Sequence, residues 1–389
     1  MVGRTPDPAR RAVGRTAGCL AALTLLIIGL EGCAEPPSSA SSTATPSGNQ
    51  PLAVDRLDPH DWLSLGPYGV GNLGCSGDEI AWTSSTQPIS KQNNRNDVIK
   101  VANLTAPDPR VVASARHGGD LTDALRATGS WLVYLEYRQN GQTSSADFWY
   151  LNAVNWTNEQ LIGLASATSG PALQELPSYD AADGRVVWNQ LNSTGESILR
   201  MYDLGKGQWT TLPLPATMYP VQPTLSANSV VFVDNSTDPY RAQEDFFSRR
   251  GSIRRFDLST NKITTLSSDP SAWMPQARGD EVIWTAMPST GPSAVSGVQL
   301  EGGPITAFGS DPVAPLTDGS IVVWYDSSDL NFMAFGLSSH HLVDLKIGNW
   351  PDIRSVFALC GDRVFFALPP VLDGSSSTIR YFVLPAGQV

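Results

Sequence analysis

Histidines and acidic residues are the side chains of this sequence best suited to acid–base or metal chemistry. The four histidines are His60, His117, His340 and His341. His340 and His341 are adjacent, and adjacent residues on a strand point to opposite faces, so the pair is a poor bidentate metal site. The sequence contains no G-x-S-x-G nucleophile elbow, no H-E-x-x-H zinc motif and no P-loop. We therefore expect no metal and no cofactor.

The acidic pairs fall in short turns between strand-like stretches. Asp78–Glu79 and Asp280–Glu281 each follow a glycine, and turn chemistry explains such residues. A glycosidase requires two carboxyl groups that converge on one sugar bond. The pattern favours a protein that is not an enzyme. A carbohydrate-active lyase or hydrolase that uses loop carboxylates and tyrosine is the alternative.

A second set of side chains is suited to binding. These residues lie in long connections, just ahead of predicted strands, and they are Tyr219, Trp273, Trp350, Asp352, His117 and Asp120. Tryptophan and tyrosine recognise sugars, peptides and protein hot spots because they combine a large apolar body with a polar atom. We expect them on one loop-bearing face, at the mouth of a channel. The alternative is that the rings cap the core between neighbouring sheets.

The longest insertion expected on that face is DPYRAQEDFFSRR, residues 238–250. Its aromatic and basic residues are Tyr240, Arg241, Phe246, Phe247, Arg249 and Arg250. In an acidic domain this is a local basic and aromatic patch, and an exposed Phe-Phe pair indicates an interaction surface. Alternatively, both phenylalanine rings pack back onto the domain.

The elements that position these residues are set by a repeat. A turn of Gly, Asp, Asn or Ser, two or three apolar residues and an aromatic recur seven times, as in GDEIAW, DGRVVW and GDEVIW. The aromatics that end the phrase are Trp82, Tyr134, Trp188, Phe232, Trp284, Trp324 and Phe366. They are 40 to 54 residues apart, which fits a four-stranded blade of about 40–50 residues better than a helical-pair repeat of about 34.

Further short β-branched phrases follow each aromatic one, such as SILRMYDL and QWTTL. The repeat thus predicts an all-β fold, a β-propeller with seven four-stranded blades. The last unit lacks its final phrase, so we expect PLAVDRL (Pro51–Leu57) to complete the last blade and close the ring. Six blades is the alternative count, if the irregular unit around Tyr134 is something else.

The stretch PTLSANSVVFVDNS, followed by SILRMYDL and QWTTL-type phrases, resembles the repeat of TolB-like propellers. The resemblance covers about residues 51–389 and implies the propeller architecture. Regular SPDG turns are missing, and no partner-binding segment of that family can be carried over to this chain.

Residues 1–33 have the character of a lipoprotein-type signal peptide. A basic start with Arg10 and Arg11 precedes an apolar run, which ends in Leu30-Glu31-Gly32-Cys33. This ending resembles a bacterial lipobox, although Glu31 is unusual there, and it predicts lipidation of Cys33. The alternative is secretion after cleavage near Ala34. Residues 34–50 are rich in Ser, Pro and Thr and are expected to form a disordered tether.

The domain after this leader is acidic. Residues 1–33 hold four arginines, one Asp and one Glu, so the remainder has 22 basic and 35 acidic residues and a formal charge of −13. An acidic surface argues against nucleic acid and anionic lipid as direct partners. We expect a monomer that meets the membrane through its lipid anchor only.

Two cysteines remain in the domain. Cys75 and Cys360 each come just before the Gly-Asp turn of a unit, one in the first unit and one in the last. In a closed ring these units are neighbours, so the cysteines should lie close together. Export permits a disulfide between them, and two buried free thiols are the alternative.

Together these observations predict a membrane-tethered binding or scaffold module of a bacterial cell envelope. It would recognise an envelope protein, a peptide or a glycan through the long-loop face. The other classes are the carbohydrate-active enzyme above and a purely structural assembly protein. Fold alone cannot choose among them, because propellers host many unrelated functions.

Overall fold

The computed structural model divides the chain into two units, residues 1–50 and 51–389. All residues that the structure describes belong to the second unit. They are residues 57, 59–66, 68–88, 95–139, 146–236, 249–286, 297–300, 305–306, 312–326, 331–345, 357–368 and 377–384. Within these ranges there is no α-helix, and none of them offers a helix that could span a membrane.

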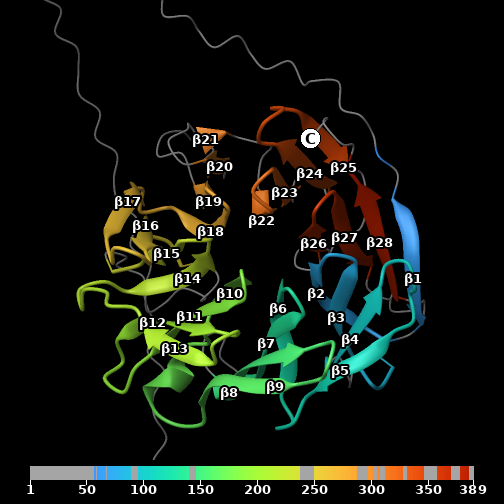
Figure 1. The fold of residues 1–389 in the computed structure, drawn as a ribbon, viewed down its shortest axis with the longest axis horizontal. Coiled ribbons are helices and arrows are strands. Elements are labelled where there is room, and N and C mark those ends of the chain that lie inside the picture. Colours follow the sequence, from blue (N-terminus) through green and yellow to red (C-terminus); the bar gives the residue numbers. More distant parts are fainter. Residues whose placement is uncertain are drawn as a thin grey trace, which may run out of the picture. The chain divides into compact units, whose positions relative to one another are not determined.

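The described strands form seven four-stranded antiparallel sheets, here called blades 1 to 7 (Figure 1). Blades 1 and 2 consist of β2 (Val70–Ser76), β3 (Glu79–Ser84), β4 (Val98–Asn103), β5 (Arg110–Ser114), β6 (Asp120–Thr128), β7 (Trp131–Gln139), β8 (Ala146–Asn155) and β9 (Leu161–Ala167). A 3-10 turn, η1 (Pro171–Gln174), leads to blade 3. Blades 3 and 4 consist of β10 (Tyr179–Ala182), β11 (Arg185–Leu191), β12 (Ser197–Asp203), β13 (Gln208–Thr211), β14 (Pro220–Leu225), β15 (Ser229–Asp234), β16 (Ser252–Asp257) and β17 (Ile263–Ser267).

Blades 5 and 6 consist of β18 (Trp273–Arg278), β19 (Glu281–Ala286), β20 (Gly297–Leu300), β21 (Ile305–Thr306), β22 (Pro312–Thr317), β23 (Ile321–Asp326), β24 (Asn331–Gly336) and β25 (Leu342–Leu345). Blade 7 combines β26 (Phe357–Cys360), β27 (Arg363–Leu368) and β28 (Ser377–Val383) with β1 (His60–Gly66) from the start of the domain. The first strands of successive blades contact one another around a complete circle, since β26 also contacts β2. The unit around Tyr134 forms the regular blade 2, so the seven repeats make seven sheets.

The strand that closes the ring was placed wrongly by the sequence. An N-terminal strand does complete the last blade, but it is β1 (His60–Gly66) and not Pro51–Leu57, whose first six residues lie outside the described ranges. Trp62 explains why His60–Gly66 is the closing strand. Its ring packs against Trp82 and Phe365, and its Nε1 donates a hydrogen bond to the Leu104 carbonyl at 3.1 Å. His60 and Trp62 therefore belong to the outer strand of blade 7.

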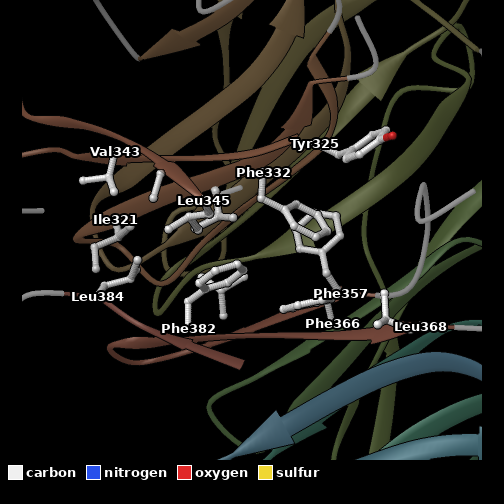
Figure 2. Packing of buried hydrophobic residues seen from close by; sticks show 13 residues of the cluster. Ile321, Tyr325, Phe332, Val343, Leu345, Phe357, Phe366, Leu368, Phe382 and Leu384 are labelled. Atoms are coloured by element: carbon white, nitrogen blue, oxygen red, sulfur yellow. The ribbon is translucent and has the colours of Figure 1, made fainter. Parts of the chain in front are cut away.

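The core lies between neighbouring blades. All seven aromatics that end the repeated phrase are at most 2% exposed, and each lies on the second strand of its blade. Figure 2 shows one such layer, where Phe332 of blade 6 meets Phe357 and Phe366 of blade 7. Burying one such ring stabilises the fold by roughly 1.5–3 kcal/mol relative to leaving it exposed.

Short hairpins join the first and second strands. In blade 3 the two-residue loop Asp183–Gly184 has φ angles of 50° and 71°, the combination of a type I′ turn, which Asp-Gly favours. These hairpins lie at the carboxyl ends of the inner strands and define the short-turn face. The opposite ends of the inner strands, with the longer connections, define the long-loop face.

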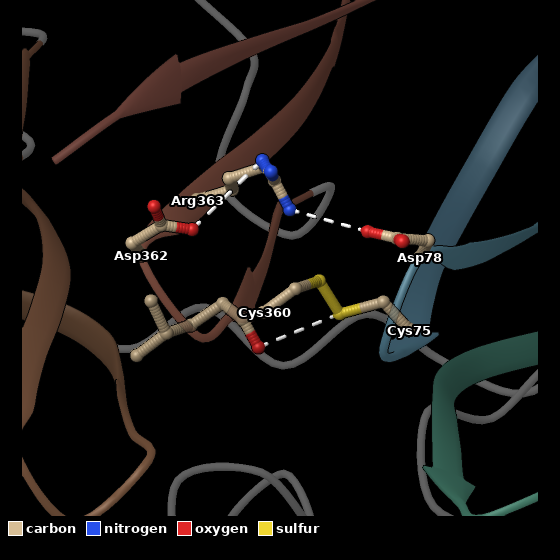
Figure 3. The surroundings of a disulfide bond; sticks show 6 residues. Cys75, Asp78, Cys360, Asp362 and Arg363 are labelled. Carbon is tan, nitrogen blue, oxygen red and sulfur yellow. Dashed lines mark hydrogen bonds and ion pairs between the residues drawn. A yellow bond between two sulfur atoms is a disulfide. The ribbon is translucent and has the colours of Figure 1, made fainter. Parts of the chain in front are cut away.

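The inner strands of blades 1 and 7 are also joined covalently. Cys75 of β2 and Cys360 of β26 form a disulfide with their Cα atoms 6.0 Å apart (Figure 3). Beside it, Arg363 of blade 7 forms an ion pair with Asp78 of blade 1 at 3.3 Å. The ring is therefore closed twice, by the disulfide on the inside and by β1 on the outside.

Candidate functional site

Two of the predicted binding aromatics lie on the long-loop face. Tyr219 immediately precedes β14, and Trp273 is the first residue of β18. Both side chains are half-buried. Tyr219 packs against the core between blades 4 and 5, which includes Ala272. Its backbone N–H donates to Asp234 Oδ1 at 3.2 Å, and its carbonyl accepts from Asn235 N at 3.0 Å. The ring therefore caps the core, as the alternative expected, and its position is rigidly held.

A buried carboxylate holds the phenol of Tyr219. Glu175, directly after η1, is 1% exposed. It accepts a hydrogen bond from Tyr219 Oη at 2.6 Å and another from Asn189 Nδ2 at 3.1 Å. Arg249 Nη1 lies 2.7 Å from Glu175 Oε2, with only 7% of the arginine side chain exposed. Blade 3, the start of blade 4 and the end of the long insertion thus meet at one carboxylate.

The two arginines that end the insertion each cover an aromatic ring. Arg249 Cζ lies 5.7 Å from the centre of the Tyr219 ring, and Arg250 Cζ lies 4.6 Å from that of Trp273. We call Tyr219, Arg249, Arg250 and Trp273 the arginine–aromatic patch. Cation–π contacts of this kind contribute roughly 0.5–2 kcal/mol each. Because each contact fixes both the arginine and the aromatic ring, the side chains of the patch are ordered.

The environment of Tyr219 predicts a measurable titration. Burial, the nearby Glu175 charge and the hydrogen bond to it together raise the pKa of Tyr219 to about 12. A raised folded-state pKa means that the stability contributed by the protonated phenol is lost as pH rises from about 10 to about 12. Near-ultraviolet titration of the wild type minus that of Tyr219→Phe should show one tyrosine ionising near pH 12. A difference curve centred near pH 10 would contradict the buried contact with Glu175.

His117 and Asp120 belong to a different cluster, at the start of blade 2. Glu136 accepts hydrogen bonds from the backbone N–H groups of Arg116 at 3.1 Å, His117 at 2.6 Å and Gly119 at 3.2 Å, and lies 3.1 Å from His117 Nδ1. The His117 ring stacks on Tyr150 with 3.7 Å between centroids. Burial raises the pKa of Glu136, but these hydrogen bonds outweigh it and lower the pKa overall.

Asp120 is held less tightly than Glu136. Arg95 Nε lies 3.4 Å from Asp120 Oδ1. Burial raises the pKa of Asp120 more than the Arg95 charge lowers it. The cluster around Glu136 holds the connection between blades 1 and 2, and the structure does not bring it together with the arginine–aromatic patch.

No protein-family model and no curated protein matches this chain. Among solved structures, the β-propeller domain of the Trilobed protease from Pyrococcus furiosus has a TM-score of 0.50 at 10% identity, covering 80% of this chain and 97% of that one. The acylaminoacyl peptidase of Pyrococcus horikoshii has a TM-score of 0.53 at 8% identity, covering 82% and 52%. The fold is a β-propeller.

A chain in a mitotic checkpoint complex is similar to the same extent, with a TM-score of 0.51 at 9% identity over 82% of this chain and 93% of that chain. This chain spans about half the length of the acylaminoacyl peptidase. At such identities the likeness shows the fold alone, because unrelated functions share it.

The remaining predicted site residues lie outside the described residues. They are Cys33 of the predicted signal peptide and Tyr240, Phe246, Phe247, Trp350 and Asp352 of the domain. Sequence reasoning missed Glu175, since nothing local marks a glutamate after a short turn as buried. Among the described residues no group of three His, Cys, Asp or Glu side chains could hold a metal ion.

Proposed function

We propose that this chain is a binding or scaffold propeller that recognises a protein, peptide or glycan through its long-loop face. Its repeat would be of the TolB-like type, and a lipidated Cys33 with the tether of residues 34–50 would hold it on the outer side of a bacterial membrane. The observation that carries the recognition role is the arginine–aromatic patch. Tyrosine, tryptophan and arginine dominate the hot spots of protein interfaces.

The contacts that hold the patch in place favour a binding role. Glu175 is buried and bonded to both Tyr219 and Arg249, so these side chains are ordered before a partner arrives. Preorganised side chains lose less conformational entropy on association, and this loss is roughly 0.5–1.5 kcal/mol for each mobile side chain. A partner that offers a carboxylate or an apolar face would complement Arg250 and the rings of Tyr219 and Trp273, which are only half-buried.

The buried carboxylates of the described residues have structural partners that occupy them. Asp180 accepts from Arg278, Thr224 and the Leu225 N–H, and Glu136 accepts from three backbone N–H groups. The pKa of each is lowered by these partners despite burial. A general base that works near neutral pH needs a pKa near that pH, so Asp180 and Glu136 are unsuited to that role.

The test is cross-linking of the native lipidated chain in its own envelope. The variant Arg250→Ala/Trp273→Ala removes one cation–π pair of the patch. Its matched control is Arg200→Ala/Trp209→Ala, which removes a similar pair elsewhere. Arg200 Cζ lies 4.8 Å from the ring centre of Trp209, which is on the exposed edge strand β13. We expect a partner cross-linked to wild type and control, and reduced at least about tenfold in the patch variant.

Loss of the partner in both variants, or in neither, would refute recognition through the patch. A glycan partner is sought in parallel by binding purified envelope polysaccharide to the same three proteins. The lipid anchor is tested by Cys33→Ser, which should release the protein from the membrane fraction.

A further inference from the structure

The channel at the centre of the ring contains a cavity of about 220 Å3. It is lined by the inner strands of every blade except blade 4, at positions next to the short-turn face. Its apolar wall includes Leu73, Leu125, Leu316 and Phe357. Neither Tyr219 nor Trp273 lines it, so this cavity is separate from the arginine–aromatic patch.

Two arginines that line the cavity both contact Asp180. They are Arg126 of β6 and Arg278 of β18, with 27% and 24% of their side chains exposed. Behind them Asp180 of β10 is 2% exposed. Arg278 binds it with both terminal nitrogens, Nη1 to Oδ2 at 2.8 Å and Nη2 to Oδ1 at 3.0 Å.

The carboxylate of Asp180 is saturated by its other partners. Its Oδ2 also accepts from Thr224 Oγ1 at 2.8 Å and from Leu225 N at 2.9 Å, while Oδ1 lies 3.5 Å from Arg126 Nε. A carboxylate offers about four lone-pair sites, so Asp180 has no capacity for the remaining donors of Arg126.

Arg126 therefore keeps donors for a ligand. A guanidinium has five N–H donors, and within the described part of the chain Arg126 uses Nε toward Asp180 and Nη1 toward the Leu125 carbonyl at 3.3 Å. Its Nη2 has no acceptor there. Because only 27% of the Arg126 side chain is exposed, its charge interacts more strongly with an anion in the cavity than it would in bulk water.

We propose that this cavity binds a small carboxylate with an aliphatic tail. The carboxylate accepts hydrogen bonds from Arg126, in the planar geometry that guanidinium and carboxylate share. The tail lies against the leucines and Phe357. The cavity is smaller than the roughly 300–1,000 Å3 of pockets for drug-sized ligands, which limits the ligand to a few carbon atoms beyond its carboxylate.

The experiment is isothermal titration of the full chain, in detergent, with isocaproate and with its neutral isostere isocaproamide. We expect saturable isocaproate binding with a dissociation constant on the order of 1 mM, and binding of the amide at least about tenfold weaker. Arg126→Met should weaken isocaproate binding at least about tenfold, because it removes the free donors but leaves the Asp180–Arg278 pair.

The matched control is Arg138→Met, since Arg138 also lies in blade 2 but is 55% exposed and pairs with Asp147. It should bind isocaproate as the wild type does. Absence of saturable binding to the wild type, or an unchanged affinity in Arg126→Met, would overturn the proposal. If Arg126→Met does not fold, the comparison of acid with amide on the wild type decides, and equal affinity for the two refutes a carboxylate site.

Discussion

Replacing Asp180 by alanine should lower the free energy of unfolding by about 3–5 kcal/mol, the usual cost of removing one partner from a buried ion pair. The substitution leaves Arg278 without its bidentate acceptor and Arg126 without its ion-pair partner. It also removes the acceptor of the Leu225 N–H. These groups belong to blades 2 to 5, so one substitution loosens four blades. Urea unfolding followed by tryptophan fluorescence measures the change.

The matched control for this loss is Asp183→Asn, because asparagine removes the charge and tolerates the φ of 50° at this turn position. Asp183 is three residues further along the same hairpin, but its side chain is 61% exposed and lies 3.9 Å from Arg185. Exposed ion pairs contribute at most about 1 kcal/mol, so the control should unfold close to the wild type. Equal destabilisation by the two substitutions would contradict a special role for the buried Asp180.

The same carboxylate predicts a dependence of stability on acid pH. Burial raises the pKa of Asp180, but Arg278, Arg126 and the Leu225 N–H outweigh it and bring the pKa from 3.8 to about 2. A depressed folded-state pKa gives stability that is present above the unfolded value of about 3.9 and is lost as pH falls toward 2. The difference in unfolding free energy between wild type and Asp180→Ala should therefore shrink between about pH 4 and pH 2. A constant difference over this range would be inconsistent with an ionised Asp180.

The blades could be predicted from the sequence because their signals are local. Each aromatic that ends the repeated phrase lies within a few residues of its own turn, and all seven are buried in the structure. The closing strand was misplaced because two neighbouring stretches, Pro51–Leu57 and His60–Gly66, both have strand character. Pairing of His60 with Tyr381 and packing of Trp62 decide between them, and those partners are distant in the sequence.

The site was predictable only in part, for a similar reason. Tyr219, Trp273 and the arginines at the end of the insertion could be singled out by residue type. The groups that hold them could not, because Glu175 becomes buried only when residues 189, 219 and 249 converge on it. Likewise, Asp180 meets Arg278 across 98 residues of sequence. Buried polar contacts between blades depend on the closed ring, so no short sequence pattern marks them.

Removing the disulfide should cost the propeller about 2–5 kcal/mol of unfolding free energy. Cys75 and Cys360 are 285 residues apart, and in the chain-entropy model a longer closed loop restricts the unfolded chain more. The substitution weakens the junction between the first and last blades, because the bond ties the inner strand of blade 1 to that of blade 7 (Figure 3). The pairing of β1 with β28 still closes the ring, so we expect a destabilised fold and not an unfolded chain.

The measurement is urea unfolding of the wild type and of Cys75→Ala/Cys360→Ala, each with and without a reducing agent. Reduction should lower the wild-type midpoint toward that of the double variant, and it should leave the variant unchanged. Because the variant has no bond to reduce, it separates loss of the disulfide from any other effect of the reductant. A wild-type midpoint that does not move, under conditions where a thiol assay finds both Cys75 and Cys360 reduced, would show that the bond adds nothing to the closure that β1 already provides.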